Sequence, residues 1–372
     1  MRLSRRLVAW SLYDWASSPV PTLHATFIFS VFFTTAVMPE GGTAAWAWMT
    51  AGTALAAGLW FIEPAASFAM LALGLSALSI FAMEISFVFY NAMLPSVARE
   101  DEYGRASGLA WGLGYAGAII ALAIVLLLFV LPEAPAFGIG TEKAAHIRVT
   151  MCFAALWLCV FAVPLFLYVP APPATPSRQP FLASLRHSLR LAMSIPGMAR
   201  FLVARMLFAD GLVTLFAFGG IYAATVFGFS QTMVLVFGII LNITAGIGAA
   251  LGGVADDRLG SIRVMRGCLL ALAALGIAAI LAPGEALFWA AGAALGLFIG
   301  PLQSSARAWV ARRAPPDQRA SLFGLMMFSG KATSFVGPLL YGVLVTATGS
   351  DRAGMAIVIL LLLAGWVVMP RR

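Results

Sequence analysis

The chain has 372 residues, of which 62% are hydrophobic and only 10% are charged. This composition excludes an ordinary soluble domain and predicts an all-α integral membrane protein, a polytopic helical bundle with about 11 apolar helices. The net charge of +8 is not a nucleic-acid signal, because basic residues of a membrane protein collect in its cytoplasmic loops.

The N-terminal half opens with a basic segment and a long apolar stretch, residues 7–37. Pro19 and Pro21 interrupt this stretch and remove backbone donors, which predicts a broken helix. In a bilayer, a broken helix is tolerated where it is buried or lines a cavity. The next stretch, residues 44–62, is short. Longer helices are then predicted at residues 65–94, 105–130 and 149–169.

The short stretch at 44–62 creates a problem of topology. Most of the 23 lysines and arginines fall on segments that we assign to the cytoplasm, which places both termini and the central linker inside. An odd number of apolar stretches precedes the linker, whereas an even number of crossings is required. We therefore predict that residues 44–62 form a re-entrant or surface-lying segment. A tilted crossing, which would put residues 96–105 outside, stays open as the alternative.

A linker containing proline and serine, residues 170–198, separates an incomplete N-terminal bundle, residues 1–169, from a C-terminal six-helix bundle, residues 199–372. Apolar residues recur within the linker at helical spacing: Leu182, Leu185, Leu189 and Met193. Arg186 and Arg190 lie beside them. This pattern predicts an amphipathic helix on the inner membrane surface, and a solvated linker helix is the other interpretation.

Six helices are predicted in the C-terminal half: residues 200–227, 231–255, 262–282, 285–311, 320–346 and 353–369. One of them begins with Arg319-Ala-Ser321, and Arg105-Ala-Ser107-Gly108 opens a corresponding helix in the first half. This correspondence indicates a parallel repeat of the two halves. The helix predicted at residues 105–130 contains four glycines, which predict close packing against a neighbouring helix. They are Gly108, Gly112, Gly114 and Gly117.

Residues 252–267 interrupt two apolar runs with glycines, aspartates and arginines. An aspartate here can interact with the positive end of the next helix, and an arginine can bridge to a facing segment. We predict a gating loop formed by Asp256, Asp257, Arg258, Gly260 and Arg263. Arg307, near the inner end of its own helix, is expected to bridge to residues 256–258.

The spacing Gly253-Val-Ala-Asp-Asp257-Arg258-Leu-Gly260 resembles the G-x-L-A-D-R-x-G loop of major facilitator transporters. Further stretches resemble the vacuolar-amino-acid-effluxer-like branch of that superfamily: Ala9-Trp-Ser-Leu-Tyr-Asp14-Trp15, Phe87-Val-Phe-Tyr90-Asn91-Ala-Met-Leu-Pro95, Asp210-Gly211 and Ser329-Gly330-Lys331 through Gly337-Pro338. The resemblance implies two pseudo-symmetric helical halves and transport of amino acids or similar metabolites. The family has the loop once in each half, whereas this chain has one copy and only residues 44–62 where two helices are expected.

Polar residues at the expected depth of the bilayer are candidates for a substrate or proton pathway, because such residues usually face a cavity or a partner. They are Asp14, His24, Glu84, Asp210, Asn242 and Lys331. Glu84 is the preferred proton carrier, since a desolvated carboxylate readily takes up a proton.

Structural interpretations of these residues stay open beside the functional ones. Asp14 could pair with an arginine or cap the break at Pro19, and Glu84 could bond to a serine or tyrosine. Lys331 could form an internal ion pair with Asp210 or Glu84. Asn242 could hold two helices together, and His24 could be purely structural.

These patterns predict a secondary active transporter of a small solute, with proton coupling left open. The alternative is a truncated transporter-like protein that no longer transports and serves as a receptor or partner. No nucleotide-binding loop, zinc spacing or catalytic triad occurs in the sequence, so we expect neither an enzyme nor a cofactor or metal. Expected partners are the solute, protons and the lipid bilayer, without nucleic acid, and a monomer is assumed. The expected location is the inner or plasma membrane.

Overall fold

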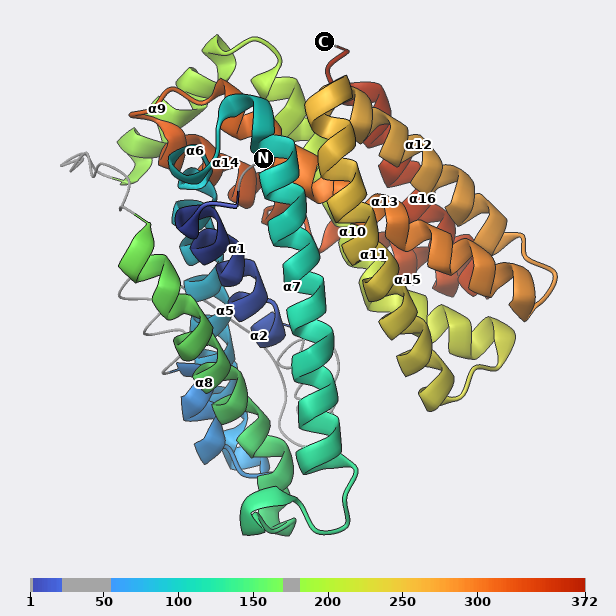
Figure 1. Ribbon diagram of the computed structural model, residues 1–372. Helices are drawn as coiled ribbons and strands as arrows, with labels where there is room; N and C mark the ends of the chain where they lie inside the picture. The colour runs from blue at the N-terminus through green and yellow to red at the C-terminus, as the bar shows by residue number, and fades with distance from the viewer. Residues whose placement is uncertain (1–2, 22–54, 170–180, 372) are drawn as a thin grey trace. The chain divides into compact units, whose positions relative to one another are not determined.

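The computed structural model describes residues 3–21, 55–169 and 181–371, and every regular element in these ranges is a helix (Figure 1). Eight of the described helices are long and apolar enough to cross a membrane. They are Met70–Ala92, Glu100–Val130, Glu142–Tyr168, Met198–Phe227, Thr232–Leu259, Ser261–Ile280, Glu285–Arg313 and Asp351–Val368. The predicted all-α polytopic bundle is confirmed. His24 and most of the stretch at 44–62 lie outside the described residues.

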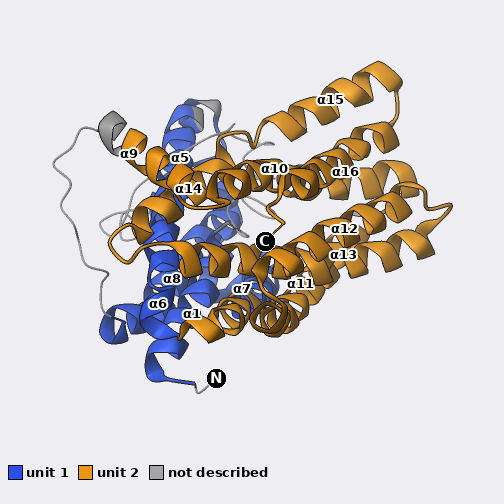
Figure 2. Cartoon of the chain, turned by 90° about the horizontal axis from the view of Figure 1, so that it is seen from above, with its two compact units in different colours: residues 1–98, 113–172 blue, residues 99–112, 173–372 orange. Residues whose placement is uncertain are grey.

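The chain divides into two compact units, which we describe separately (Figure 2). Unit 1 comprises residues 1–98 and 113–172, and unit 2 comprises residues 99–112 and 173–372. The segment 99–112, which the sequence assigns to the N-terminal bundle, is therefore grouped with the C-terminal half. The domain boundaries given from the sequence stay predictions.

Unit 1 contains the N-terminal helices and the second part of α7. Its elements are α1 (Arg5–Ser17), α2 (Pro19–Pro21), η2 (Leu59–Phe61), η3 (Ala66–Phe68), α5 (Ala69–Ala92), α6 (Leu94–Val97), α7 from residue 113 (Tyr103–Val125 in full), the π-helical η5 (Leu126–Val130), η6 (Ala136–Gly138), η7 (Glu142–Ala144) and α8 (Ala145–Tyr168). The Ser4 side chain caps α1 by accepting a hydrogen bond from the Leu7 N–H. As predicted, the first helix is interrupted at Pro19, since α1 ends at Ser17.

Aromatic side chains hold the core of unit 1 together. The rings of Trp10 and Tyr90 stack with centroids 4.7 Å apart, and those of Trp15 and Trp157 stack at 5.7 Å. Each pair also makes a hydrogen bond from an indole N–H to a backbone carbonyl, at 2.9 Å and 3.2 Å respectively. These contacts fix α1 against α5 and α8, because buried indoles pack well and still satisfy their donors.

Unit 2 contains the start of α7 and the C-terminal helices. Its elements are η4 (Glu100–Glu102), α7 up to residue 112, α9 (Phe181–Ser194), α10 (Met198–Phe227), α11 (Gln231–Leu259), α12 (Ser261–Ile280), α13 (Glu285–Arg313), α14 (Arg319–Lys331), α15 (Val336–Thr348) and α16 (Asp351–Val368). Helix α13 packs on α11 and α12, and α16 packs on α10 and α12. At Gly248 a Cβ atom would lie 2.2 Å from the Leu297 carbonyl oxygen, so α11 and α13 touch through their backbones.

The predicted continuous helix at 320–346 is wrong, because the chain forms α14 and α15 with a break at residues 332–335. Pro338 lacks the N–H that would bond back into the preceding turn, and Gly330 and Gly337 are weak helix formers. Three-residue turn bonds replace the helical ladder, from Ser334 to Lys331 and from Val336 to Thr333.

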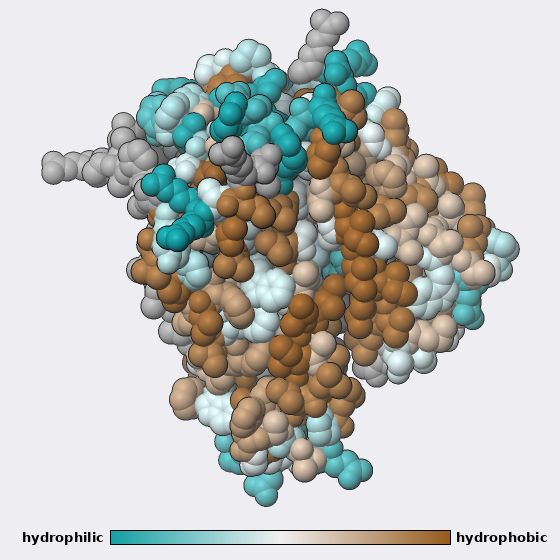
Figure 3. Space-filling view, in the orientation of Figure 1, coloured by the Kyte–Doolittle hydropathy of each residue, from teal (hydrophilic) through white to brown (hydrophobic). Residues whose placement is uncertain are grey.

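The long helices expose large apolar side chains along their sides, and Figure 3 shows hydrophobic residues over the length of the helices and hydrophilic residues at helix ends. Leu167 of α8, Leu251 of α11 and Val367 of α16 are each more than 60% exposed. Such surfaces are rare on soluble proteins and suit contact with lipid.

Candidate functional site

The start of α7 lies directly against α11 in unit 2. Glycines recur every four residues on α7, at Gly104, Gly108 and Gly112. A Cβ atom on Gly108 would lie 2.3 Å from the Ala249 carbonyl oxygen and 2.9 Å from Cα of Gly253. The two backbones are therefore in contact, and side chains would force them apart. The close packing predicted for Gly108 is confirmed.

Asp257 caps the N-terminus of α7. Its carboxylate accepts hydrogen bonds from the backbone N–H groups of Gly104 at 2.7 Å and Arg105 at 3.0 Å. The Arg105 Nε donates to the same carboxylate at 2.8 Å. A carboxylate at this position satisfies otherwise unpaired donors and interacts favourably with the helix dipole.

Arg312, in the last turn of α13, bridges both aspartates. Its Nη2 donates to Asp257 Oδ1 at 2.9 Å, while Nη1 donates to Asp256 Oδ1 and, at 2.7 Å, to Ser261 Oγ. The Asp256 side chain is fully buried. We call Arg105, Asp256, Asp257 and Arg312 the Asp–Arg cluster.

Arg307 takes a different partner from the one predicted. Its Nε donates to the Ser107 hydroxyl and its Nη2 to the Ser107 carbonyl, both at 2.8 Å, and it is buried. The bridge to residues 256–257 is made by Arg312 instead. Arg312 lies about one and a half turns farther along α13, where the helix reaches the end of α11. Both arginines thus hold the first turns of α7 to α13.

The other loop residues shape the turn between α11 and α12. Gly260 has a φ of +88°, a conformation that side chains with a Cβ rarely adopt. Arg258 is exposed, and Arg263 donates to the Leu259 carbonyl at 3.1 Å. Of the loop residues named from the sequence, only Asp256 and Asp257 belong to the cluster. Arg105 and Arg312 were missed, since a sequence cannot show which distant arginine reaches the loop.

Asp210 of α10 caps the second half of the broken helix. Both of its carboxylate oxygens accept from the Gly337 N–H, each at 3.1 Å, at the start of α15. Asp210 is buried, and its own carbonyl accepts from Thr214 Oγ1 at 2.8 Å. Lys331 is the last residue of α14 and is exposed. Lys331 thus ends the helix before the break, and Asp210 of α10 caps the helix after it.

Asn242 is separate from that break. Its amide Nδ2 donates to the Gly238 carbonyl of the same helix at 2.8 Å. Arg205 of α10 is buried and donates to the Met326 carbonyl of α14 at 3.1 Å. Its Nη1 also reaches Gln303 Oε1 at 3.3 Å.

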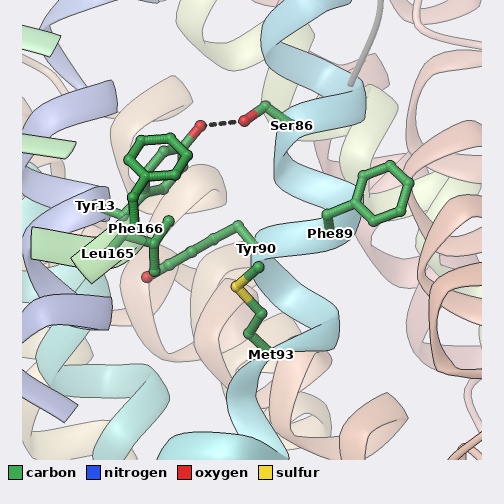
Figure 4. Close-up of a pocket in the computed structure, with 7 residues that line it drawn as sticks. All are labelled: Tyr13, Ser86, Phe89, Tyr90, Met93, Leu165 and Phe166. Carbon is green, nitrogen blue, oxygen red and sulfur yellow. Dashed lines mark hydrogen bonds between the residues drawn. The ribbon is translucent and has the colours of Figure 1, made fainter. Parts of the chain in front are cut away.

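Asp14 and Glu84 lie in unit 1, and each is within two residues of a side chain that lines a small pocket, Tyr13 and Ser86 respectively (Figure 4). The pocket is lined by Tyr13, Ser86, Phe89, Tyr90, Met93, Leu165 and Phe166. The hydroxyls of Tyr13 and Ser86 are hydrogen-bonded to each other. Asp14 is buried and precedes the break in the first helix, where the Ser18 hydroxyl donates to its carbonyl at 2.7 Å. Glu84 is half-buried.

Metal-binding geometry is not found in the described ranges, which hold no group of three or more histidine, cysteine or acidic side chains placed to bind an ion. What the described geometry offers instead is a set of carboxylates placed at the ends of helices. Such contacts can be made and broken as helices move, and they can respond to protons.

Comparison with known proteins identifies the family. Residues 45–371 match the family described as "Vacuole effluxer Atg22 like". The chain is 22% identical to an uncharacterized MFS-type transporter, YxiO, of Bacillus subtilis, over 99% of this chain and 95% of that protein. It is 23% identical to autophagy-related protein 22-1 of Neosartorya fischeri, over 69% of this chain. That match spans about half of the fungal protein, 46% of its length.

Solved structures share the fold. The fucose:proton symporter FucP of E. coli superposes with a TM-score of 0.68 at 17% identity, covering 98% of this chain and 97% of that one. The human organic anion transporter MFSD10 gives a TM-score of 0.71 at 14% identity, covering 98% of this chain and 83% of that one. Together with the family match, the chain belongs to the Vacuole effluxer Atg22 like branch of the major facilitator superfamily of membrane transporters.

Proposed function

We propose that this membrane transporter is a secondary active carrier that moves amino acids or similar small metabolites by alternating access. In this mechanism, the contact between α7 and α11 would form one gate, held shut by the Asp–Arg cluster. The gate opens when the Asp–Arg cluster releases the start of α7.

The geometry of the Asp–Arg cluster is the observation that carries this proposal. The cluster joins α7, α11 and α13 through a few charged hydrogen bonds over a glycine contact. Hydrogen bonds to charged groups contribute about 1.5–3 kcal/mol each, so a handful of them can hold a gate without making it permanent. Helix movement that breaks one set of polar contacts and forms another is a common device of transporters.

Proton coupling would act through Asp210 and Glu84. Both Asp210 oxygens accept from the Gly337 N–H, and an added proton would remove the negative charge and leave only one of the two oxygens as an acceptor. Protonation would therefore weaken the cap of α15 and loosen the break between α14 and α15. Glu84, half-buried in α5, is the second candidate.

The test is solute flux in liposomes that contain the purified protein. Uptake of labelled amino acids is expected to exceed that of protein-free liposomes and to increase under an imposed pH gradient. Loss of the gradient-driven component in Glu84→Gln or Asp210→Asn, with passive exchange kept, would support coupling. Equal uptake with and without the gradient in wild type would refute coupling but not transport.

A second candidate is a transporter-like protein without transport activity. The alignment to the Bacillus subtilis relative extends over 409 residues, more than the 372 of this chain, so the relative has residues that this chain lacks. If this candidate is right, folded wild-type protein will give no flux across a broad panel of amino acids and related metabolites.

We also propose that the protein lies in the inner or plasma membrane with both termini in the cytoplasm. This orientation places residues 96–105 inside and makes 44–62 re-entrant or surface-lying. A single cysteine introduced at Ser96, in a background without the natural cysteines, would be labelled only after permeabilisation. Labelling of intact cells by an impermeant reagent would contradict the re-entrant arrangement.

A further inference from the structure

One end of unit 2 carries several arginines that form no salt bridge with any residue the structure describes. Residues 143–209 contain neither aspartate nor glutamate, and this span includes α9 and the start of α10. Arg186, Arg190 and Arg200 are exposed. Among the described residues, no salt bridge joins any of them to a carboxylate.

Further arginines gather at the end of α16. Arg200 and Arg371 both lie within electrostatic reach of Arg266. Arg266 stacks on the Trp366 ring at 4.4 Å and donates to the Trp366 carbonyl at 3.0 Å. Arg200 Nε donates to the Val368 carbonyl at 3.2 Å. Carbonyls at a helix C-terminus carry only about half a negative charge, so a positive surplus stays at this end.

Helix α9 has one side packed against the protein and an apolar side left uncovered. Ser188 and Ala192 are buried where α9 packs on α10 and α14. Leu189 is 44% exposed and Met193 is 69% exposed. The exposed arginines of α9 lie next to these two side chains. An apolar row beside basic residues is typical of a helix lying at the boundary between lipid headgroups and acyl chains.

The arginines of α9 and those near α16 lie at the same end of unit 2. Helix α9 leads directly into the N-terminus of α10, and Pro370 lies 3.5 Å from the position of a Cβ on Gly197, just before α10. Figure 1 shows α9 and the C-terminal end of the chain at the top of the view. Of the acidic residues in or beside the helices that contact α9, Asp210 is buried within α10 and caps α15, and Asp317, before α14, accepts a hydrogen bond from Gln318.

We propose that this arginine surface binds anionic phospholipid headgroups of the adjacent leaflet. Its residues are Arg186, Arg190, Arg200, Arg266 and Arg371, with Leu189 and Met193 entering the acyl boundary. The arginines would contact headgroup phosphates, and α9 would fix the level of this end of unit 2 in the membrane. The proposal concerns the lipid environment and does not depend on which solute is carried.

The experiment compares lipids retained by the whole protein. Purified protein is equilibrated with mixed micelles of phosphatidylglycerol and phosphatidylcholine, and bound lipid is counted by native mass spectrometry. Wild type should be enriched in phosphatidylglycerol. The Arg186→Gln/Arg190→Gln variant should lose about fivefold in relative affinity for each arginine removed. High salt should reduce the enrichment of wild type as well.

A matched control removes two positive charges that already have carboxylate partners. Arg99 pairs with Asp101 and Lys143 pairs with Glu63, so Arg99→Gln/Lys143→Gln should keep the wild-type enrichment. An equal loss in both variants, or no preference of wild type for phosphatidylglycerol, would overturn the proposal.

The position of α9 gives a second and independent readout. In a background without the natural cysteines, Leu189→Cys labelled with a polarity-sensitive fluorophore is placed in bilayers with brominated acyl chains. Quenching is expected, and it should decrease in the Arg186→Gln/Arg190→Gln background. An unquenched, water-exposed probe would show that α9 is a solvated linker helix. Neither readout requires transport, so failure here is distinguishable from failure of the proposed function.

Discussion

Individual side chains in unit 2 take partners that the sequence alone could not assign. Arg307 and Arg312 lie on one helix, yet Arg307 reaches Ser107 while Arg312 reaches Asp256 and Asp257. The sequence indicates that arginines near the C-terminal end of α13 would meet the loop. It cannot show which one, because that depends on the rotation and depth of α13 against α11. The polar loop itself was recognisable, since its charges interrupt apolar runs.

Removal of Arg312 should be far more damaging than removal of Arg258. Arg312→Ala leaves Asp256 buried with only the Ser261 hydroxyl as partner, and breaking a buried pair typically costs about 3–5 kcal/mol. Arg258 is exposed, so Arg258→Ala should be nearly neutral. Thermal unfolding of the purified variants measures the difference. Equal melting temperatures would show that the Asp–Arg cluster does not hold α7 in place.

The role of Asp210 can be tested with two substitutions that separate the effect of its charge from the effect of its hydrogen bonds. Asp210→Asn keeps an oxygen that can accept from the Gly337 N–H, whereas Asp210→Ala leaves α15 uncapped. Loss of such a cap costs about 0.5–2 kcal/mol, so the alanine variant should unfold at a lower temperature than the asparagine variant. If the proposed coupling is right, both variants lose gradient-driven flux. Gradient-driven flux retained in the asparagine variant would limit Asp210 to a structural role.

At the scale of whole helices, hydropathy and glycine spacing predicted much of what the structure shows. The apolar runs of α10 to α13 and α16 were located correctly, because a spanning helix needs a long apolar stretch. The break between α14 and α15 was missed. Gly337-Pro338 weakens the ladder there, but many membrane helices continue through such a pair when neighbours satisfy the freed groups. Asp210, which is distant in sequence, stabilises the break.

The glycine contact between α7 and α11 should be intolerant of a single methyl group. Gly108→Ala would place a Cβ 2.3 Å from the Ala249 carbonyl oxygen, and such overpacking typically costs about 1–3 kcal/mol. Gly267 of α12 is a matched control, since a Cβ there meets nothing within 4 Å. Gly267→Ala should leave the melting temperature unchanged or raise it slightly. Equal effects of the two substitutions would contradict the close contact.

For the whole molecule, the sequence pattern predicts the family and the fold. It does not predict which helices are held together at the proposed gate. Family resemblance predicted two halves with a division near residue 170. The grouping of residues 99–112 with the C-terminal helices was not predicted. It arises from the backbone contacts at Gly108 and the capping of α7 by Asp257. A transporter whose gate joins α7 to α11 must separate these two helices during each cycle.

The most direct test of that claim is a reversible cross-link between α7 and α11. A Cβ on Gly112 would lie 3.9 Å from the Ala250 Cβ, which suits a disulfide. Gly112→Cys/Ala250→Cys is placed in a background without Cys152, Cys159 and Cys268, and flux into liposomes is measured before and after reduction. Each single-cysteine variant serves as a control for oxidation. We predict that flux is absent while the disulfide is intact and returns on reduction. Undiminished flux with the disulfide fully formed would contradict the proposed gate.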